Sequence, residues 1–202
     1  MLGRVFATCL TLAAIVAPAH AQLTFQASED PGRVVIQLTQ YVGIEGDDTP
    51  LLRIYGDGRV LVHFPVYMRR AGDYSLQLDP GELNSLLRTF VDGGLVDFDP
   101  ERVKSEIRDA TLAGQRAALQ AGAPATLTTR SNDTMVSLDV ELDTYTGPDG
   151  ATRQGVSARI AWAGAQHDAR DFPGVASLQS MAAIEQQLMA LTEHPNLVRV
   201  TP

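Results

Sequence analysis

Apolar and polar residues alternate on both sides of Gly56-Asp57-Gly58, a sequence that favours a tight turn. A three-residue loop would place Ile54 opposite Val60, and the alternating apolar positions of both strands would then share one face. The other face would carry charged and polar side chains, as expected for antiparallel strands with one solvated side. Residues 51–64 are therefore expected to form a hairpin.

A longer alternation surrounds a second turn at residues 147–150. Matching the apolar positions sets the register and places Leu142 opposite Val156. The intervening positions carry carboxylates, and this register places Asp139 opposite Arg159, a favourable cross-strand pair. The sequence therefore predicts a second hairpin with one buried and one solvated face.

Three segments show helical signals. The first helix begins after Asp79, which with Glu82 has the spacing of a capping box, and ends at Gly93. The last helix covers 176–193 and has an apolar stripe at helical spacing. Between them, a helix with a weak apolar face is predicted over 101–121.

Further strands are expected at 33–41, 74–78 and 196–200. The order of hairpin, helix, hairpin and helix indicates an α+β fold: an antiparallel sheet built from two hairpins with helices packed on one face. Neither half has a sheet large enough to cover its helix. A single α+β domain is therefore expected over 22–202, with a helical and loop insertion at about 100–132.

Residues 1–21 have the layout of a secretory signal peptide. Arg4 supplies the basic start, an apolar run covers 5–16, and Ala19 and Ala21 form a small-residue cleavage site. The apolar run is too short to span a bilayer, so no stable membrane insertion is expected after cleavage. The protein is expected to be exported, to the periplasm if the cell is Gram-negative or otherwise to the medium.

The formal net charge of −8 makes nucleic acid and anionic lipid unfavourable partners. The single cysteine, Cys9, lies within the signal segment, so the mature chain is expected to have no disulfide, thiol nucleophile or zinc thiolate site. The alternating carboxylates of 139–143 are interpreted as a solvated strand face, because calcium prefers a curved loop with many oxygens. We expect no cofactor and no metal.

One segment has the composition of a protein interface. Phe64, Tyr67, Met68, Arg69 and Arg70 combine two aromatic rings, a methionine and two arginines, residue types that are enriched where proteins meet. These residues are the candidate partner-binding site. The alternative interpretation is an ordinary edge strand with Phe64 and Val66 in the core.

His167, Asp168 and Arg170 form a compact polar cluster in a predicted loop. A catalytic triad assembles from distant residues, so these side chains are compatible with an enzyme, but the chain has no Gly-x-Ser-x-Gly nucleophile motif. A pocket that joined them to Asp139 or Glu141 would favour a hydrolase or a small-ligand binder. Their dispersal over separate surfaces would count against it.

The hairpin motif of 52–60, the leucine-rich helix of 83–90 and the sequence Gly-Leu-Val-Asp-Phe at 94–98 resemble small bacterial proteins of unknown function. The same layout is similar to emfourin, a proteinaceous inhibitor of thermolysin-like metalloproteases. The resemblance covers about residues 33–98, with a looser match at the second hairpin and last helix. It implies the fold and an inhibitor-like role, and it assigns no inhibitory residue.

These observations favour an exported, non-enzymatic module that binds an envelope or secreted protein, as an inhibitor or an accessory subunit. The alternatives are a small-ligand binder or hydrolase that uses His167, Asp168 and Arg170, and a purely structural envelope protein.

Overall fold

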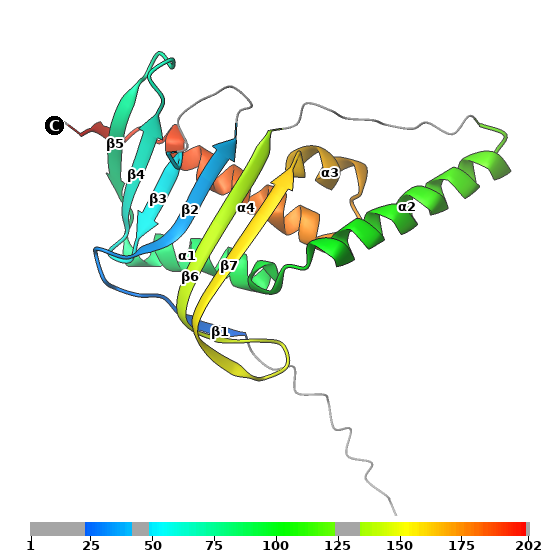
Figure 1. Ribbon diagram of the computed structural model, residues 1–202, viewed down its shortest axis with the longest axis horizontal. Coiled ribbons are helices and arrows are strands. Elements are labelled where there is room, and N and C mark those ends of the chain that lie inside the picture. The colour runs from blue at the N-terminus through cyan, green and yellow to red at the C-terminus, as the bar shows by residue number, and fades with distance from the viewer. Residues whose placement is uncertain (1–22, 42–48, 124–133, 201–202) are drawn as a thin grey trace, which may run out of the picture.

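The computed structural model describes residues 23–41, 49–123 and 134–200. Within these ranges, eight strands form one antiparallel sheet, accompanied by four α-helices and a short 3-10 helix (Figure 1). The expected α+β fold with an antiparallel sheet is thus confirmed. The predicted signal segment, 1–21, and part of the predicted insertion lie outside the described residues.

The strands are β1 (Thr24–Gln26), β2 (Val34–Tyr41), β3 (Leu52–Tyr55), β4 (Arg59–Phe64), β5 (Gly72–Gln77), β6 (Met135–Thr146), β7 (Thr152–Ala163) and β8 (Val198–Arg199). The helices are α1 (Pro80–Asp92), the 3-10 helix η1 (Leu95–Asp97), α2 (Pro100–Gln120), α3 (Ala165–Asp171) and α4 (Ala176–Thr192).

The sheet joins the two predicted hairpins through a strand between them. Its order is β1-β6-β2-β3-β4-β5-β8, and β7 pairs with β6 as well. Ile54 lies opposite Val60, and Leu142 lies opposite Val156, as the alternation predicts. The sheet is larger than two hairpins, because β2 connects β3 to β6 and because β5 and β8 extend it beyond β4.

Apolar residues of the strands and helices form one core. In the view of Figure 1, α1 and α4 lie behind the sheet. The apolar stripe of α1 is buried, with Phe90 fully inaccessible, and so is that of α4, with Ile184 and Leu188 fully inaccessible. Alternate strand residues such as Ile54 and Val60 join the same cluster. Burial of this apolar surface is the main force that holds the fold together.

The ends of α1 follow the predicted signals. The backbone N–H of Glu82 donates to the Asp79 carboxylate and the backbone N–H of Asp79 donates to the Glu82 carboxylate, each over 2.8 Å. This capping box satisfies donors that have no partner within the helix. Gly94, with φ of 68°, adopts the left-handed conformation that turns the chain into η1.

Helix α2 projects away from the sheet (Figure 1). Of its residues only Val103 is buried, and Leu119 is 71% exposed near its end. The weak apolar face predicted for this segment explains why it packs so little. Among the described residues, no helix is both long and apolar enough to cross a membrane.

The prediction of a loop at residues 167–171 is wrong, because the chain forms α3 there. Seven mixed residues show no apolar periodicity, so the sequence gives little helical signal. Tertiary contacts stabilise α3 instead. Ala165 and Ala169 are buried, and the side-chain amide of Gln166 donates to the Ala182 carbonyl of α4 over 2.7 Å.

Tyr145 links the second hairpin to η1. Its hydroxyl donates to the Asp97 carboxylate over 2.8 Å, and Arg153 pairs with the same carboxylate. Burial, together with that hydrogen bond, raises the pKa of Tyr145 from 10.0 to about 12. The folded state therefore keeps the phenol protonated at a pH where the unfolded chain ionises it.

The contribution of this raised pKa to stability is expected to be complete below pH 10 and to be lost as the pH rises toward about 12. An ultraviolet absorbance titration of the folded protein should show one phenol that ionises near pH 12, and Tyr145→Phe should remove that step. If the Tyr145→Phe titration curve keeps the late step, the assignment to Tyr145 is wrong.

Gly56 allows the segment between β1 and β2 to approach the β3–β4 turn. A methyl group at this position would lie 2.2 Å from the Ser28 carbonyl oxygen and 2.8 Å from that of Asp30. Gly56→Ala is therefore expected to lower the free energy of unfolding by about 2–3 kcal/mol, measured by urea denaturation. Gly174→Ala is the matched control, because a methyl group there meets no atom within 4 Å. Equal stability of the two variants would contradict the close approach.

Candidate functional site

The loop of residues 65–71, which joins β4 to β5, is held by its own backbone hydrogen bonds. The N–H of Met68 donates to the Pro65 carbonyl over 2.9 Å, and the N–H of Ala71 donates to the Met68 carbonyl over 3.1 Å. These bonds form two successive turns. The loop therefore has a defined backbone although most of its side chains are exposed.

Two aromatic rings and an arginine support the base of this loop. The rings of Phe64 and Tyr74 meet edge to face with centroids 5.5 Å apart. The Arg70 guanidinium lies 5.2 Å from each centroid, within the range of a cation–π interaction. Phe64 is partly buried and packs against the core. Phe64 thus supports the loop from beneath, and Arg70 is an exposed residue that covers both rings.

The tip of the loop presents apolar side chains to solvent. Val66 is 90% exposed, Tyr67 is 65% exposed and Met68 is 41% exposed. Single exposed apolar residues are common, but three in succession on an ordered loop form a patch. The alternative interpretation as an edge strand holds for Phe64, which ends β4 and packs against the core, and is wrong for Val66, which is exposed.

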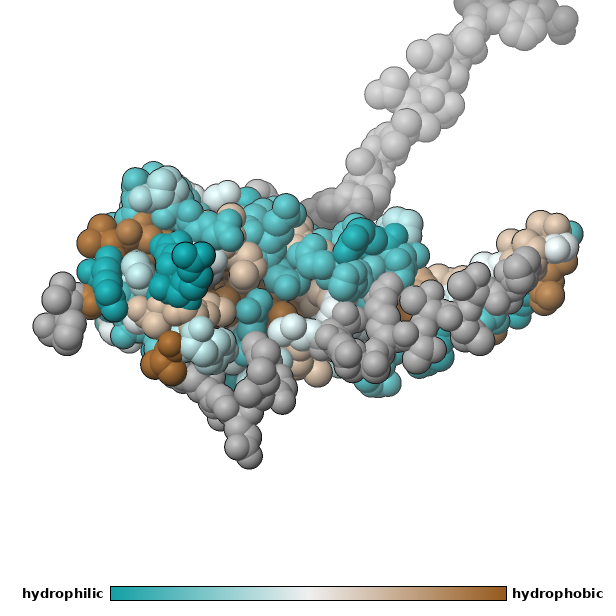
Figure 2. Space-filling view, turned by 90° about the horizontal axis from the view of Figure 1, so that it is seen from above, coloured by the Kyte–Doolittle hydropathy of each residue, from teal (hydrophilic) through white to brown (hydrophobic). Residues whose placement is uncertain are grey.

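Strand β8 brings a second group of exposed apolar residues to the same corner. The Val200 N–H donates to the Asp73 carbonyl over 2.8 Å, and the Arg199 side chain donates to the Ala71 carbonyl over 3.2 Å. Val198 and Val200 are 65% and 42% exposed. Figure 2 shows hydrophobic surface at the end of the molecule that carries β5 and β8, and also at the far end of α2.

We call this region the corner surface. It consists of Val66, Tyr67, Met68, Arg69, Arg70, Val198, Arg199 and Val200.

The corner surface is positively charged on a protein whose formal net charge is −8. It holds three guanidinium groups, on Arg69, Arg70 and Arg199. The carboxylate of Asp73, on β5 beside this region, lies 2.6 Å from the His63 ring nitrogen Nδ1. An apolar patch flanked by arginines is complementary to an apolar surface that carries carboxylates.

Among the described contacts, Asp168 and Arg170 of the α3 cluster bond to groups other than the carboxylates of β6. Asp168 accepts a hydrogen bond of 2.8 Å from the Trp162 indole, and Arg170 donates to the Gln166 carbonyl of its own helix. His167 is exposed on the same short helix.

The carboxylates of β6 are engaged in ion pairs on the face of the sheet. Asp139 pairs with Arg159, as the register predicts, while Arg33 lies 3.2 Å from Glu141 and 2.7 Å from Asp143. Within the described ranges, no group of three or more acidic, histidine or cysteine side chains could hold a metal ion.

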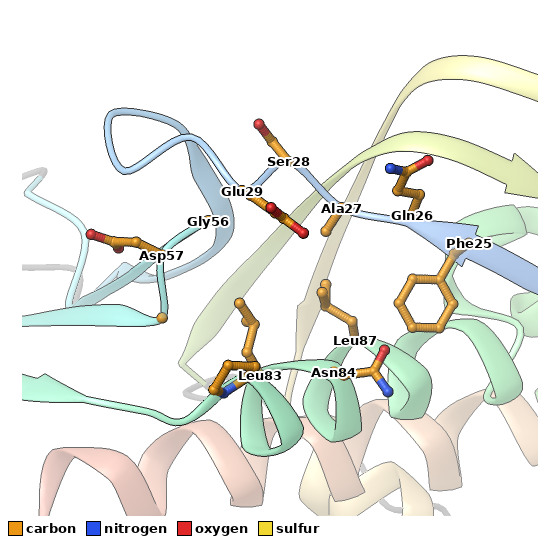
Figure 3. A pocket seen from close by; sticks show the side chains of 12 residues that line it. Phe25, Gln26, Ala27, Ser28, Glu29, Gly56, Asp57, Leu83, Asn84 and Leu87 are labelled. Carbon is orange, nitrogen blue, oxygen red and sulfur yellow. The ribbon is translucent and has the colours of Figure 1, made fainter.

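A pocket of about 490 Å³ lies at the other end of β4 from the corner surface. It is bounded by residues 25–29, by the turn at 56–58 and by the first turns of α1 (Figure 3). We call it the α1 pocket. Sequence reasoning missed it, because its walls come from three segments that are far apart along the chain. None of His167, Asp168 and Arg170 lines it.

Comparisons with models of protein families, with curated proteins and with solved structures found no match. None of these comparisons supports the resemblance to emfourin that the sequence motifs suggest.

Proposed function

We propose that the protein is an exported, non-enzymatic module that uses the corner surface to bind another envelope or secreted protein, as an inhibitor or an accessory subunit. The observation that carries this proposal is the exposure of Val66, Tyr67 and Met68 on a loop whose backbone is fixed. The layout of residues 1–21 supports export, and the resemblance to emfourin supports an inhibitor-like role.

Tyr67 and Arg69 are the residues expected to contribute most to binding. Tyrosine and arginine are the side chains that most often dominate the energy of protein interfaces. The turns of the loop and the stacking of Arg70 on Phe64 and Tyr74 hold its backbone before a partner arrives. Such preorganisation reduces the entropy lost on association, so more of the contact energy appears as affinity.

The partner should present an apolar contact site bordered by carboxylates. Charge complementarity of this kind mainly accelerates association and depends on ionic strength. Binding is therefore expected to weaken when salt is raised, while the apolar contacts maintain part of it.

Affinity capture from the cell's own envelope extract tests the proposal, with residues 22–202 as bait. The Tyr67→Ala/Arg69→Ala variant removes one large exposed ring and one guanidinium. The Arg116→Ala/Leu119→Ala variant on α2 is the control, because it removes an exposed arginine and an exposed apolar side chain far from the corner surface. One protein in near-equal amount, lost with the first variant and kept with the second, is the expected result.

Two outcomes would contradict the proposal. The first is equal capture by both variants, which would place binding elsewhere. The second is sedimentation of the protein with anionic lipid vesicles that Tyr67→Ala/Arg69→Ala abolishes, with no protein captured, which would assign the corner surface to a membrane.

A further inference from the structure

The α1 pocket combines an apolar floor with a carboxylate that faces it. Leu83 and Leu87 of α1 form the floor and are only 7% and 2% exposed, and Phe25 closes one side. Figure 3 shows the Glu29 carboxylate on the side of the pocket that faces these two leucines. The volume of the pocket, about 490 Å³, falls within the range of known small-ligand sites, roughly 300–1,000 Å³.

The lining favours a cation. Glu29 and Asp57 are its charged members, and none of the described lining residues is basic. The Asp57 carboxylate is engaged within the β3–β4 turn. It accepts a hydrogen bond of 3.0 Å from the Arg59 N–H and lies 3.9 Å from the Arg59 guanidinium. Glu29 has no hydrogen-bonding or ionic partner among the described residues, so its carboxylate is available to a ligand.

An anion is not favoured, although the pocket reaches the first turn of α1. Free N–H groups at a helix start attract anions. Here the Asp79 and Glu82 carboxylates accept the N–H groups of the capping box, each over 2.8 Å. The beginning of α1 therefore adds negative charge instead of free donors.

A nearby arginine sets the orientation of a bound cation. The Arg88 guanidinium lies 5.8 Å from the centroid of the Phe25 ring. A second positive charge beside Phe25 would be repelled, so the charge of a ligand belongs beside Glu29 and its apolar part toward Phe25. This orientation matches the distribution of apolar and acidic side chains in the pocket.

We propose that the α1 pocket binds a monocationic group on a short aliphatic chain, a guanidinium or primary ammonium, with the charge on Glu29 and the chain on Leu83 and Leu87. The inference is independent of the corner surface, because the two sites lie at opposite ends of β4. The group could be a free amine or the basic side chain of a peptide.

The test is a ¹H–¹⁵N NMR titration with n-butylguanidinium, with n-butylurea as the neutral isostere. Shifts are expected at residues 25–29, 56–58 and 80–87. Removal of the ligand's charge should weaken binding about ten-fold, and Glu29→Gln should have a similar effect, because a charge-assisted hydrogen bond is lost in both cases. Glu193→Gln, which removes an exposed carboxylate outside the pocket, should bind like the wild type.

A capped Gly-Arg-Gly peptide distinguishes the two sources of the cation. Tighter binding than n-butylguanidinium would assign the pocket to a basic side chain of a protein, and equal or weaker binding would assign it to a free small molecule. Equal affinity for n-butylurea, an unchanged affinity in Glu29→Gln, or shifts outside the three segments would each overturn the proposal.

Discussion

The Tyr67→Ala/Arg69→Ala variant is expected to lose at least about 100-fold in affinity for its protein partner, since hot-spot side chains of these types each contribute about 2–4 kcal/mol. Its free energy of unfolding should stay within about 0.5 kcal/mol of the wild type. Both side chains are exposed, and the hydrogen bonds that hold the loop are made by its backbone. Urea denaturation gives the stability, and quantitative capture gives the binding.

Lost binding with unchanged stability would show that Tyr67 and Arg69 serve binding and are not needed for folding. A marked loss of stability in Tyr67→Ala/Arg69→Ala would mean that the tip of the loop is needed for folding. Phe64→Ala is the informative comparison, because Phe64 packs on the core and against Tyr74 and Arg70. It should lower stability and binding together, whereas the tip variant should lower binding alone.

Phe90→Ala is expected to lower the free energy of unfolding by about 3–5 kcal/mol, the largest single effect on stability that we expect. Phe90 is fully inaccessible on the buried stripe of α1 and belongs to the core shared by the helices and the sheet. The alanine would leave a cavity as well as lose the transfer free energy of the ring. A domain typically has only about 5–15 kcal/mol of stability, so the variant should be partly unfolded at mild denaturant concentrations.

Leu112→Ala is the matched control for that experiment, because Leu112 is 48% exposed on α2. Its free energy of unfolding should change by less than about 0.5 kcal/mol in the same urea titration. A loss in Phe90→Ala no greater than in Leu112→Ala would contradict the assignment of α1 to the core.

The elements that the sequence predicts well are those set by local patterns. The three-residue loop at 56–58 and the alternation around it determine the pairing of Ile54 with Val60. The spacing of Asp79 and Glu82 likewise determines where α1 begins. In each case residues that are close in the sequence determine the structure, so the element can be predicted without knowledge of tertiary contacts.

Elements that depend on tertiary contacts cannot be predicted from local sequence patterns. Helix α3 forms because Ala165 and Ala169 are buried, and its sequence alone resembles a loop. The three-residue strand β1 pairs with the far end of β6, a contact between segments more than a hundred residues apart. No local pattern indicates such a pairing.

The candidate site was found in part from composition. Tyr67, Met68, Arg69 and Arg70 lie on the corner surface, whereas Phe64 lies beneath it as support. Composition does not show that Val198 of β8 and the following Val200 reach the same corner, because this depends on the pairing of β8 with β5. The α1 pocket is likewise a product of the fold, and no sequence motif marks it.

The most direct test of the proposed function is photo-cross-linking in the producing cells, with p-benzoyl-L-phenylalanine in place of Tyr67. The same substitution at Leu119 on the exposed end of α2 is the control. We expect one cross-linked protein of the envelope or medium from position 67 and none in common with position 119. No cross-linked protein at position 67, or the same products from both positions, would contradict the assignment of the corner surface as a protein-binding site.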